Sequence, residues 1–285
     1  MRTAGFANLS HLQALPLALT LLLFLVFPIG VILVVSFWDY DSYQLIPDFV
    51  LGNYQYLLGS AVTWQAYLNT FKYALSTWAI TLALGFTVAY YLAFHIRSNK
   101  VQTLLFLLCT IPFFTSNIIR MISWIPLLGR NGLVNSSLMG AGLIEQPLEF
   151  LLYSDFSIIL AYVHLYTLFM VVPIFNTMMR IDRRLIEAAR DAGARPWQIL
   201  LLVIVPLCKS GILIGSIFVV TLVMGDFVTV RIMGGGLHAS VGVLIHNEIS
   251  LLQYPAAAAS AVVLLATVLL MLVAMFRLVD IRKEL

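Results

Sequence analysis

An all-α integral membrane protein with six transmembrane helices is the fold class that this sequence predicts. Hydrophobic residues make up 61% of the 285 positions and charged residues only 10%, whereas about a quarter of an ordinary soluble domain is charged. Apolar runs long enough to cross a bilayer core about 30 Å thick, which takes roughly 20 residues of helix, recur along the chain. Lipid cannot satisfy open backbone groups, so we expect these runs to be helical.

Each expected span is an apolar run bounded by polar or turn-forming residues. The first run follows Arg2 and His11, is longer than the core of a cleavable signal peptide and precedes no small-residue cleavage site, so we expect it to be retained. The connecting segments are mixed in polarity and rich in glycine turns. We therefore expect a single transmembrane domain over residues 1–285. Its spans are Leu15–Phe37, Tyr73–Phe94, Val101–Ile119, Phe156–Met178, Pro206–Val228 and Ala256–Phe276.

The distribution of basic residues predicts the orientation, because Lys and Arg next to a span are retained on the cytoplasmic side. With the N-terminus inside, eleven of the sixteen basic residues are cytoplasmic: Arg2, Arg97, Lys100, Arg180, Arg183, Arg184, Arg190, Arg195, Arg277, Arg282 and Lys283. The outer side keeps four bases and gathers eight carboxylates: Asp39, Asp41, Asp48, Glu145, Glu149, Asp155, Asp226 and Glu248. We expect a multi-pass protein with both termini in the cytoplasm.

Several function classes are disfavoured. The basic residues lie between apolar runs rather than along one face, which argues against nucleic-acid binding. Cys109 and Cys208 lie in or beside apolar runs and indicate neither a disulfide framework nor a zinc site. No paired intramembrane carboxylates, HExxH or GxSxG motif is present, and no GxxxxGK[ST] loop for ATP. We expect no catalytic residue, no metal and no cofactor bound by this chain. A secondary transporter or channel remains an alternative, although no inverted repeat or filter ring is visible.

The most informative segment is IDRRLIEAARDAGARPWQILLLVIVPL, between the fourth and fifth runs. Residues 181–192 are strong helix formers, and Arg183 and Glu187 are four apart, a spacing that lets their side chains pair. Gly193 supplies a left-handed helix stop, and Pro196 suits the first turn of a second helix. The pattern therefore predicts a helix, a glycine turn and a helix, with residues 181–198 forming a cytoplasmic loop.

This loop resembles the EAA loop of bacterial ABC importer permeases. The resemblance rests on Glu187 followed by two alanines, on Gly193 six residues later and on Pro206 nineteen residues later. In that family the loop contains a coupling helix that docks on a separate ATP-binding subunit. The alternative is a generic amphipathic helix at the interface. The resemblance implies the coupling role for Glu187, Ala188, Ala189, Asp191 and Gly193; we call residues 181–198 the coupling loop.

The similarity extends over nearly the whole chain. The stretch IPFFTSNIIRMISWIPLLGRNGLVN at 111–135 and the Tyr254–Ala256 segment are similar to spermidine/putrescine importer permeases, specifically the first of their two membrane subunits. Permeases for 2-aminoethylphosphonate, opines and ferric iron carry similar segments. The resemblance implies a type I ABC importer permease in the bacterial cytoplasmic membrane. It also implies a dimer of ATP-binding subunits that holds ATP and Mg, a second permease subunit, and a periplasmic or lipid-anchored substrate-binding protein.

Four polar residues are candidates for a substrate path, since ionisable side chains at membrane depth are functional candidates by default. Asp226, 17 residues and about 25 Å beyond Lys209, either faces a cationic substrate or terminates the fifth span. Arg120 either lines the path or reaches the outer interface and extends its charge into water, as we expect for Lys72. His164 requires a polar partner, on a neighbouring helix or in the path. The candidates are Asp226, His164, Tyr166 and Arg120.

Overall fold

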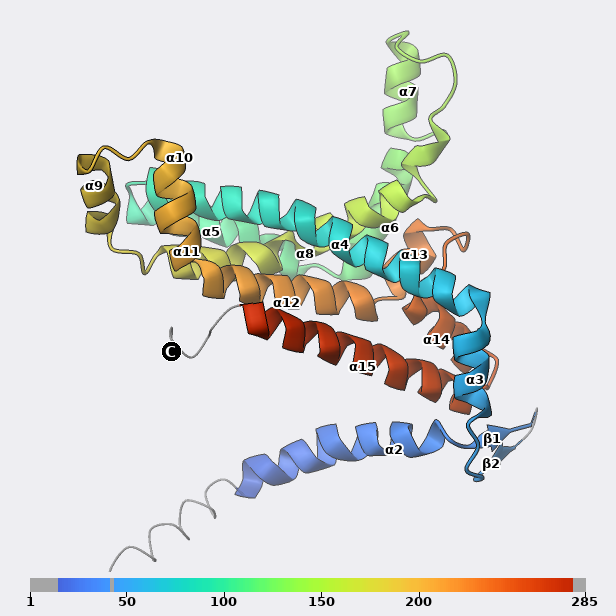
Figure 1. The fold of residues 1–285 in the computed structure, drawn as a ribbon. Helices are drawn as coiled ribbons and strands as arrows, with labels where there is room; N and C mark the ends of the chain where they lie inside the picture. The colour runs from blue at the N-terminus through green and yellow to red at the C-terminus, as the bar shows by residue number, and fades with distance from the viewer. Residues whose placement is uncertain (1–14, 42–43, 279–285) are drawn as a thin grey trace, which may run out of the picture. The chain divides into compact units, whose positions relative to one another are not determined.

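The computed structural model describes residues 15–41 and 44–278, which are mostly helical, with turns and loops between the helices (Figure 1). The strands among these residues are one antiparallel pair of two residues each, β1 (Asp39–Tyr40) and β2 (Leu45–Ile46). The described residues divide into two compact units, one up to Trp64 together with Leu244–Ala266, the other Gln65–Val243 together with the residues from Thr267. Four residues used to predict the first span and the orientation lie outside the described residues: Arg2, His11, Arg282 and Lys283.

The first unit begins with an exposed apolar helix whose end is held by side-chain hydrogen bonds. The helical residues Leu15–Val35 include η1 (Leu22–Val26) and α2 (Phe27–Val35) and bury none of their side chains in the described protein. Asn53, on α3 (Gly52–Gly59), donates from its side-chain amide to the backbone carbonyls of Ser36 and Trp38, at 3.2 and 2.8 Å. These bonds satisfy carbonyls that the helix end leaves free, and so hold α3 against the end of the first span.

The second unit contains the core of the protein. Its elements are α4 (Ala61–Tyr90), which begins in the first unit, η2 (Tyr91–His95), α5 (Asn99–Thr110), η3 (Ile111–Phe114), α6 (Asn117–Leu128), α7 (Leu133–Gly140), η4 (Glu149–Leu151), α8 (Asp155–Met178), α9 (Arg183–Asp191), α10 (Pro196–Ile199), η5 (Leu200–Ile204), α11 (Val205–Leu207), α12 (Lys209–Gly225) and α13 (Val228–Met233). Two more helices are divided between the units, α14 (Val241–Ser250) and α15 (Tyr254–Leu278). Helix α8 is the centre of the second unit and packs most extensively against α12.

Glycines allow the helices of this core to approach closely. A Cβ atom at Gly215 of α12 would lie 2.7 Å from the sulfur of Met170, on α8, and a Cβ at Gly85 of α4 would lie 2.8 Å from Cγ of the same methionine. Lipid offers little hydrophobic drive for helix association, so close packing over small residues holds such bundles together. Helices α4, α8 and α12 therefore form a tight three-helix centre around Met170.

The predicted six spans are reached only when two bent helix pairs count as one span each. Four described helices are long and apolar enough to cross a membrane: Leu15–Val35, Ala61–His95, Glu149–Met178 and Tyr254–Arg277. The pairs are Asn99–Phe114 with Asn117–Gly140, bent by 90°, and Pro196–Leu207 with Lys209–Gly225, bent by 69°.

Three predicted boundaries are wrong. The third span is not one helix over 101–119, because Pro112 has no N–H for the carbonyl four residues earlier and α5 gives way to a 3-10 turn. The second helix begins at Ala61 rather than Tyr73, since tertiary bonds stabilise its polar start: Asn69 donates to the carbonyl of Ala239 at 3.0 Å. The fifth span bends beside Pro206 and ends before Asp226.

Candidate coupling loop and polar membrane site

The first helix of the coupling loop is capped at both ends. At the start of α9, the Asp182 carboxylate accepts from the backbone N–H of Arg184 at 3.0 Å. At its end, Gly193 has φ +84°, and the backbone N–H of Ala194 donates to the carbonyl of Ala189 at 3.0 Å. This six-to-one bond with a left-handed glycine is the Schellman motif. The predicted helix and its glycine stop are confirmed.

The second helix continues directly into the membrane core. Pro196 occupies the first turn of α10, as predicted, and the side-chain oxygen of Gln198 accepts from the backbone N–H of Arg195 at 2.8 Å. Helix α10 runs through η5 and α11 to the bend before α12. The coupling loop is therefore connected to α12, which packs on α8, through consecutive helical turns with one bend of 69°.

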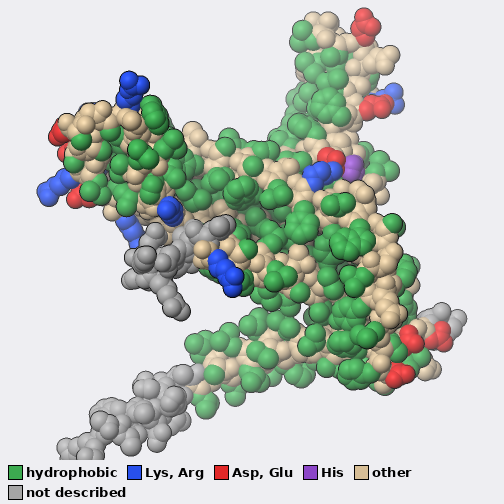
Figure 2. Space-filling view, viewed as in Figure 1, with side chains coloured by type: hydrophobic (Ala, Val, Ile, Leu, Met, Phe, Trp, Pro, Cys, Tyr) green, Lys and Arg blue, Asp and Glu red, His purple; other side chains and the backbone are tan. Residues whose placement is uncertain are grey.

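Most of the predicted coupling residues are exposed. Glu187, Ala188, Asp191 and Gly193 are exposed, and Ala189 is partly buried. Lys and Arg side chains gather around α9 and α10 in the space-filling view, next to largely apolar helices (Figure 2). This surface is therefore charged, protruding and uncovered by the described residues of the chain.

The expected pairing of Arg183 with Glu187 is wrong, since no ion pair joins them in the described part of the chain. Arg183 instead donates to the backbone carbonyl of Ala93, in η2, at 3.3 Å. A carbonyl near the end of a helix is a better partner than an exposed carboxylate in water, because surface ion pairs contribute little. Between η2 and the coupling loop lies a cavity of about 440 Å³, which Arg183, Glu187 and Arg190 help to line. The loop is thus anchored to η2 at one edge.

Two predicted path residues meet at the break between α12 and α13. The Asp226 carboxylate accepts from the hydroxyl of Tyr166 at 3.1 Å, from the backbone N–H of Thr229 at 3.1 Å and from the Thr229 hydroxyl at 2.5 Å. The Tyr162 hydroxyl also lies 3.4 Å from the Asp226 carbonyl oxygen. Asp226 therefore terminates the span and caps α13, one of the two roles that the sequence left open. Its contact with Tyr166 links this cap to α8.

His164 finds its polar partner on a neighbouring helix. It lies nine residues into α8, about 14 Å along the helix axis from Asp155. Trp124, on α6, donates its indole N–H to Nδ1 of His164 at 3.0 Å, and the two rings meet edge to face with centroids 5.7 Å apart. Since Nδ1 accepts this bond, the neutral ring carries its proton on Nε2, which remains a donor.

Arg120 lies beside the middle of α8, so of its two expected positions the structure favours the one away from the outer end of its span. The chain turns by 90° between η3 and α6, and the twenty residues after Lys100 therefore do not add up along one axis. Arg120 and His164 line one cavity of about 200 Å³, together with Thr167. The guanidinium donates to Asn117, but its buried Nε has no partner among the described residues. The cavity thus presents hydrogen-bond donors and a positive charge.

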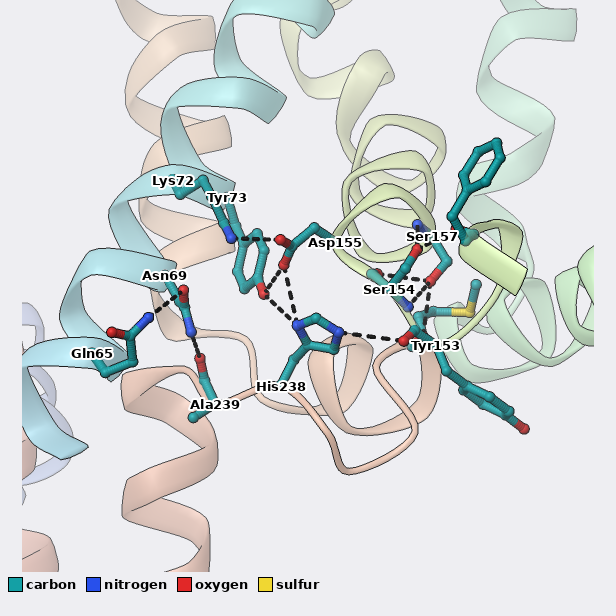
Figure 3. Close-up of polar contacts among 12 residues, drawn as sticks. Gln65, Asn69, Lys72, Tyr73, Tyr153, Ser154, Asp155, Ser157, His238 and Ala239 are labelled. Atoms are coloured by element: carbon teal, nitrogen blue, oxygen red, sulfur yellow. Dashed lines mark hydrogen bonds and ion pairs between the residues drawn. The ribbon is translucent and has the colours of Figure 1, made fainter. Parts of the chain in front are cut away.

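A polar cluster that the sequence reasoning missed lies where α8 begins (Figure 3). Asp155 accepts from Lys72 at 2.6 Å and from the Tyr73 hydroxyl at 2.6 Å, both on α4. His238, in the loop between α13 and α14, places Nδ1 3.2 Å from the same carboxylate and Nε2 3.3 Å from the carbonyl of Tyr153. Lys72 keeps a half-exposed side chain, as expected for an interfacial base, and in addition forms an ion pair with Asp155. The sequence did hold a signal for this cluster, because Lys72 and Asp155 each directly precede an expected span. Both of those spans were expected to start on the outer side of the membrane.

The family comparison matches more than half of the chain. Residues 81–282 match the family described as binding-protein-dependent transport system inner membrane component. The spermidine/putrescine transport system permease protein PotB of Escherichia coli K12 is 30% identical over 259 residues, which cover 90% of this chain and 93% of the relative. The osmoprotective compounds uptake permease protein GgtC of Synechocystis is 27% identical, covering 78% of this chain and 80% of the relative.

Solved structures share the fold at low sequence identity. A chain of a bacterial alginate ABC transporter, crystallised in complex with an alginate pentasaccharide-bound periplasmic protein, superposes with a TM-score of 0.74 at 16% identity. The superposition covers 94% of this chain and 93% of that chain. A second structure of a bacterial ABC transporter for alginate import has a TM-score of 0.73. The expected all-α type I importer permease fold is confirmed.

Proposed function

This chain belongs to the binding-protein-dependent transport system inner membrane components, and we propose that it is the subunit through which a polyamine crosses the membrane. It is a permease subunit of an ABC importer, and ATP hydrolysis belongs to a different chain of such a system. The observation that carries the polyamine assignment is the 30% identity to the spermidine/putrescine permease over 90% of this chain.

The coupling loop is the proposed docking site for the ATP-binding subunits, which bind ATP and Mg as a dimer. Glu187, Ala188 and Asp191 stand exposed on a short helix that is capped at both ends. That helix is anchored through Arg183 to η2 and continues through α10 toward α12. A rigid, exposed projection with a direct connection to the core is suited to transmit the motion of a partner subunit.

Two further partners complete the proposed importer. A second permease subunit, different from this chain, would cover part of the apolar membrane surface, and a periplasmic or lipid-anchored binding protein would deliver the substrate. The membrane is the bacterial cytoplasmic membrane, with both chain termini and the coupling loop on the cytoplasmic side. The excess of basic residues flanking the spans on that side supports this orientation.

The proposed substrate path includes Asp226, Tyr166, His164 and Arg120. Asp226 is the member of this set whose charge complements an ammonium group, and Tyr166 orients its carboxylate. Arg120 and His164 offer only donors to their cavity, which suits an anionic group instead. That cavity favours a second candidate substrate, a zwitterion such as 2-aminoethylphosphonate or an opine, over a purely cationic one.

Uptake by the complete complex separates the two candidates. Cells that carry the chain with its ATPase, second permease and binding protein should accumulate labelled spermidine or putrescine, while cells lacking only this chain should not. If the complex takes up neither polyamine but does import a phosphonate, an opine or a ferric iron chelate, the polyamine assignment is refuted and the importer class is retained.

A further inference from the structure

The ammonium of Lys72 sits in surroundings that would suit the amine of a ligand. Its nitrogen lies 2.6 Å from Oδ2 of Asp155 and 5.1 Å from the centre of the Tyr73 ring (Figure 3). A carboxylate and an aromatic face within about 6 Å are the two groups that bind alkylammonium ions in proteins. Lys72 is itself an alkylammonium ion on a flexible side chain, so its position shows that an ammonium group fits between this carboxylate and this ring.

The carboxylate of Asp155 is held in place without Lys72. Its other oxygen, Oδ1, accepts from the hydroxyl of Tyr73, whose ring is 1% exposed and therefore fixed in the core. The same oxygen lies 3.2 Å from Nδ1 of His238, and His238 is oriented by the carbonyl of Tyr153. Asp155 thus keeps Oδ2 directed at the position of the ammonium when Lys72 moves away.

Solvent reaches this ion pair, which makes exchange possible. The side chains of Lys72 and Asp155 are 44% and 42% exposed. Exposed ion pairs are weak, and a lysine side chain has enough rotatable bonds to swing aside and remain hydrated. A second ammonium can therefore take the place of the first beside Asp155 without burying a charge.

We propose that Asp155 and the face of Tyr73 form a binding site for a primary ammonium group of the substrate, and that Lys72 is a built-in competitor for it. This inference rests on the proposed polyamine function. In the orientation proposed above, the start of α8 lies on the side from which a binding protein delivers its ligand. Lys72 occupies the site when substrate is absent. When the substrate leaves, the Lys72 side chain returns to Asp155 and takes the place of the substrate ammonium.

The test is direct binding of labelled spermidine to the purified importer complex in lipid nanodiscs, without binding protein. Lys72→Met removes the competitor and should tighten binding about twofold to fivefold, the worth of an exposed ion pair. Asp155→Asn removes the anion and should weaken binding by about tenfold. Arg130→Met is the matched control, because it removes an outer base from an exposed ion pair with Glu149 at 3.8 Å and should leave binding unchanged.

Opposite effects of Lys72→Met and Asp155→Asn, at normal assembly of the complex, are the expected result. A purely structural ion pair predicts the same direction for both, so unchanged or weaker binding in Lys72→Met overturns the site. Lys72→Arg retains the charge and should bind as the wild type does. If wild-type proteoliposomes supplied with binding protein import polyamine while Lys72→Met does not bind it more tightly, only the site fails. If the wild type imports neither polyamine, the proposed function fails and the site fails with it.

Discussion

Replacing Gly193 by alanine tests the coupling loop with a perturbation whose size can be worked out. Gly193 has φ +84°, and no atom lies within 4 Å of the position that a Cβ would take. The cost is therefore backbone strain alone, about 1 kcal/mol for a non-glycine residue in the left-handed region. About 1 kcal/mol lowers the equilibrium constant for forming the native helix end by roughly fivefold.

Gly142 provides a matched control for this substitution. It has φ +68° and, like Gly193, nothing within 4 Å of its would-be Cβ, but it lies in the loop after α7. Gly142→Ala should cost the same strain at a site away from the coupling loop. Both variants should reach the membrane in similar amounts, because neither strain affects the helix core.

The assay is copurification of the ATP-binding subunit together with the ATPase rate stimulated by loaded binding protein. We expect Gly193→Ala to lower both by up to about fivefold, the change in the equilibrium constant of the helix end that its strain causes, and Gly142→Ala to leave both unchanged. Equal values in the two variants would refute the argument that the Schellman end of α9 presents the docking surface.

Three further predictions follow from contacts of single residues. Glu187→Lys reverses an exposed charge and should weaken ATPase copurification by more than about tenfold if that charge becomes buried in the interface; copurification equal to wild type would contradict docking there. Gly211→Ala should lower thermal stability by about 1–3 kcal/mol because the added Cβ overlaps the hydroxyl of Thr177, whereas Gly225→Ala, with open space around it, should not; similar melting temperatures would exclude the close packing of α8 and α12. Burial raises the pKa of Glu248, so the folded protein loses stability as pH rises above the ordinary titration range of Glu and the carboxyl is deprotonated. Glu248→Gln, which stays neutral, should therefore raise the melting temperature at pH 7 but not at pH 4. A gain found only at pH 4 would contradict this reasoning.

The coupling loop could be predicted almost entirely from its own residues. A helix bounded by Asp182 and Gly193 and followed by Pro196 depends on caps and backbone preferences that act within a few positions. The exception was the partner of Arg183, where a carbonyl of η2 replaced the local carboxylate. That carbonyl lies 90 residues away in the sequence, so no local pattern could indicate it.

The polar membrane residues could be identified as candidates but not placed. Asp226 and Tyr166 are 60 residues apart and share a hydrogen bond, and His164 meets Trp124 across 40 residues. A helix that is apolar on all sides shows no periodicity that would tell which face meets which neighbour. Arg120 was misplaced because a bend of 90° was hidden in a run that is apolar on both sides of it.

The sequence by itself determined that the chain is a helical membrane protein with a capped, charged coupling loop, because hydrophobic length and helix capping are properties of consecutive residues. The tertiary structure decided where the helices bend, that Arg120 shares a cavity with His164, and that Asp155 binds Lys72 across 83 residues. These features depend on side chains that meet only after the helices have packed. In lipid, that packing is directed by small residues and polar contacts rather than by hydrophobicity, and the one-dimensional pattern does not record which contacts form.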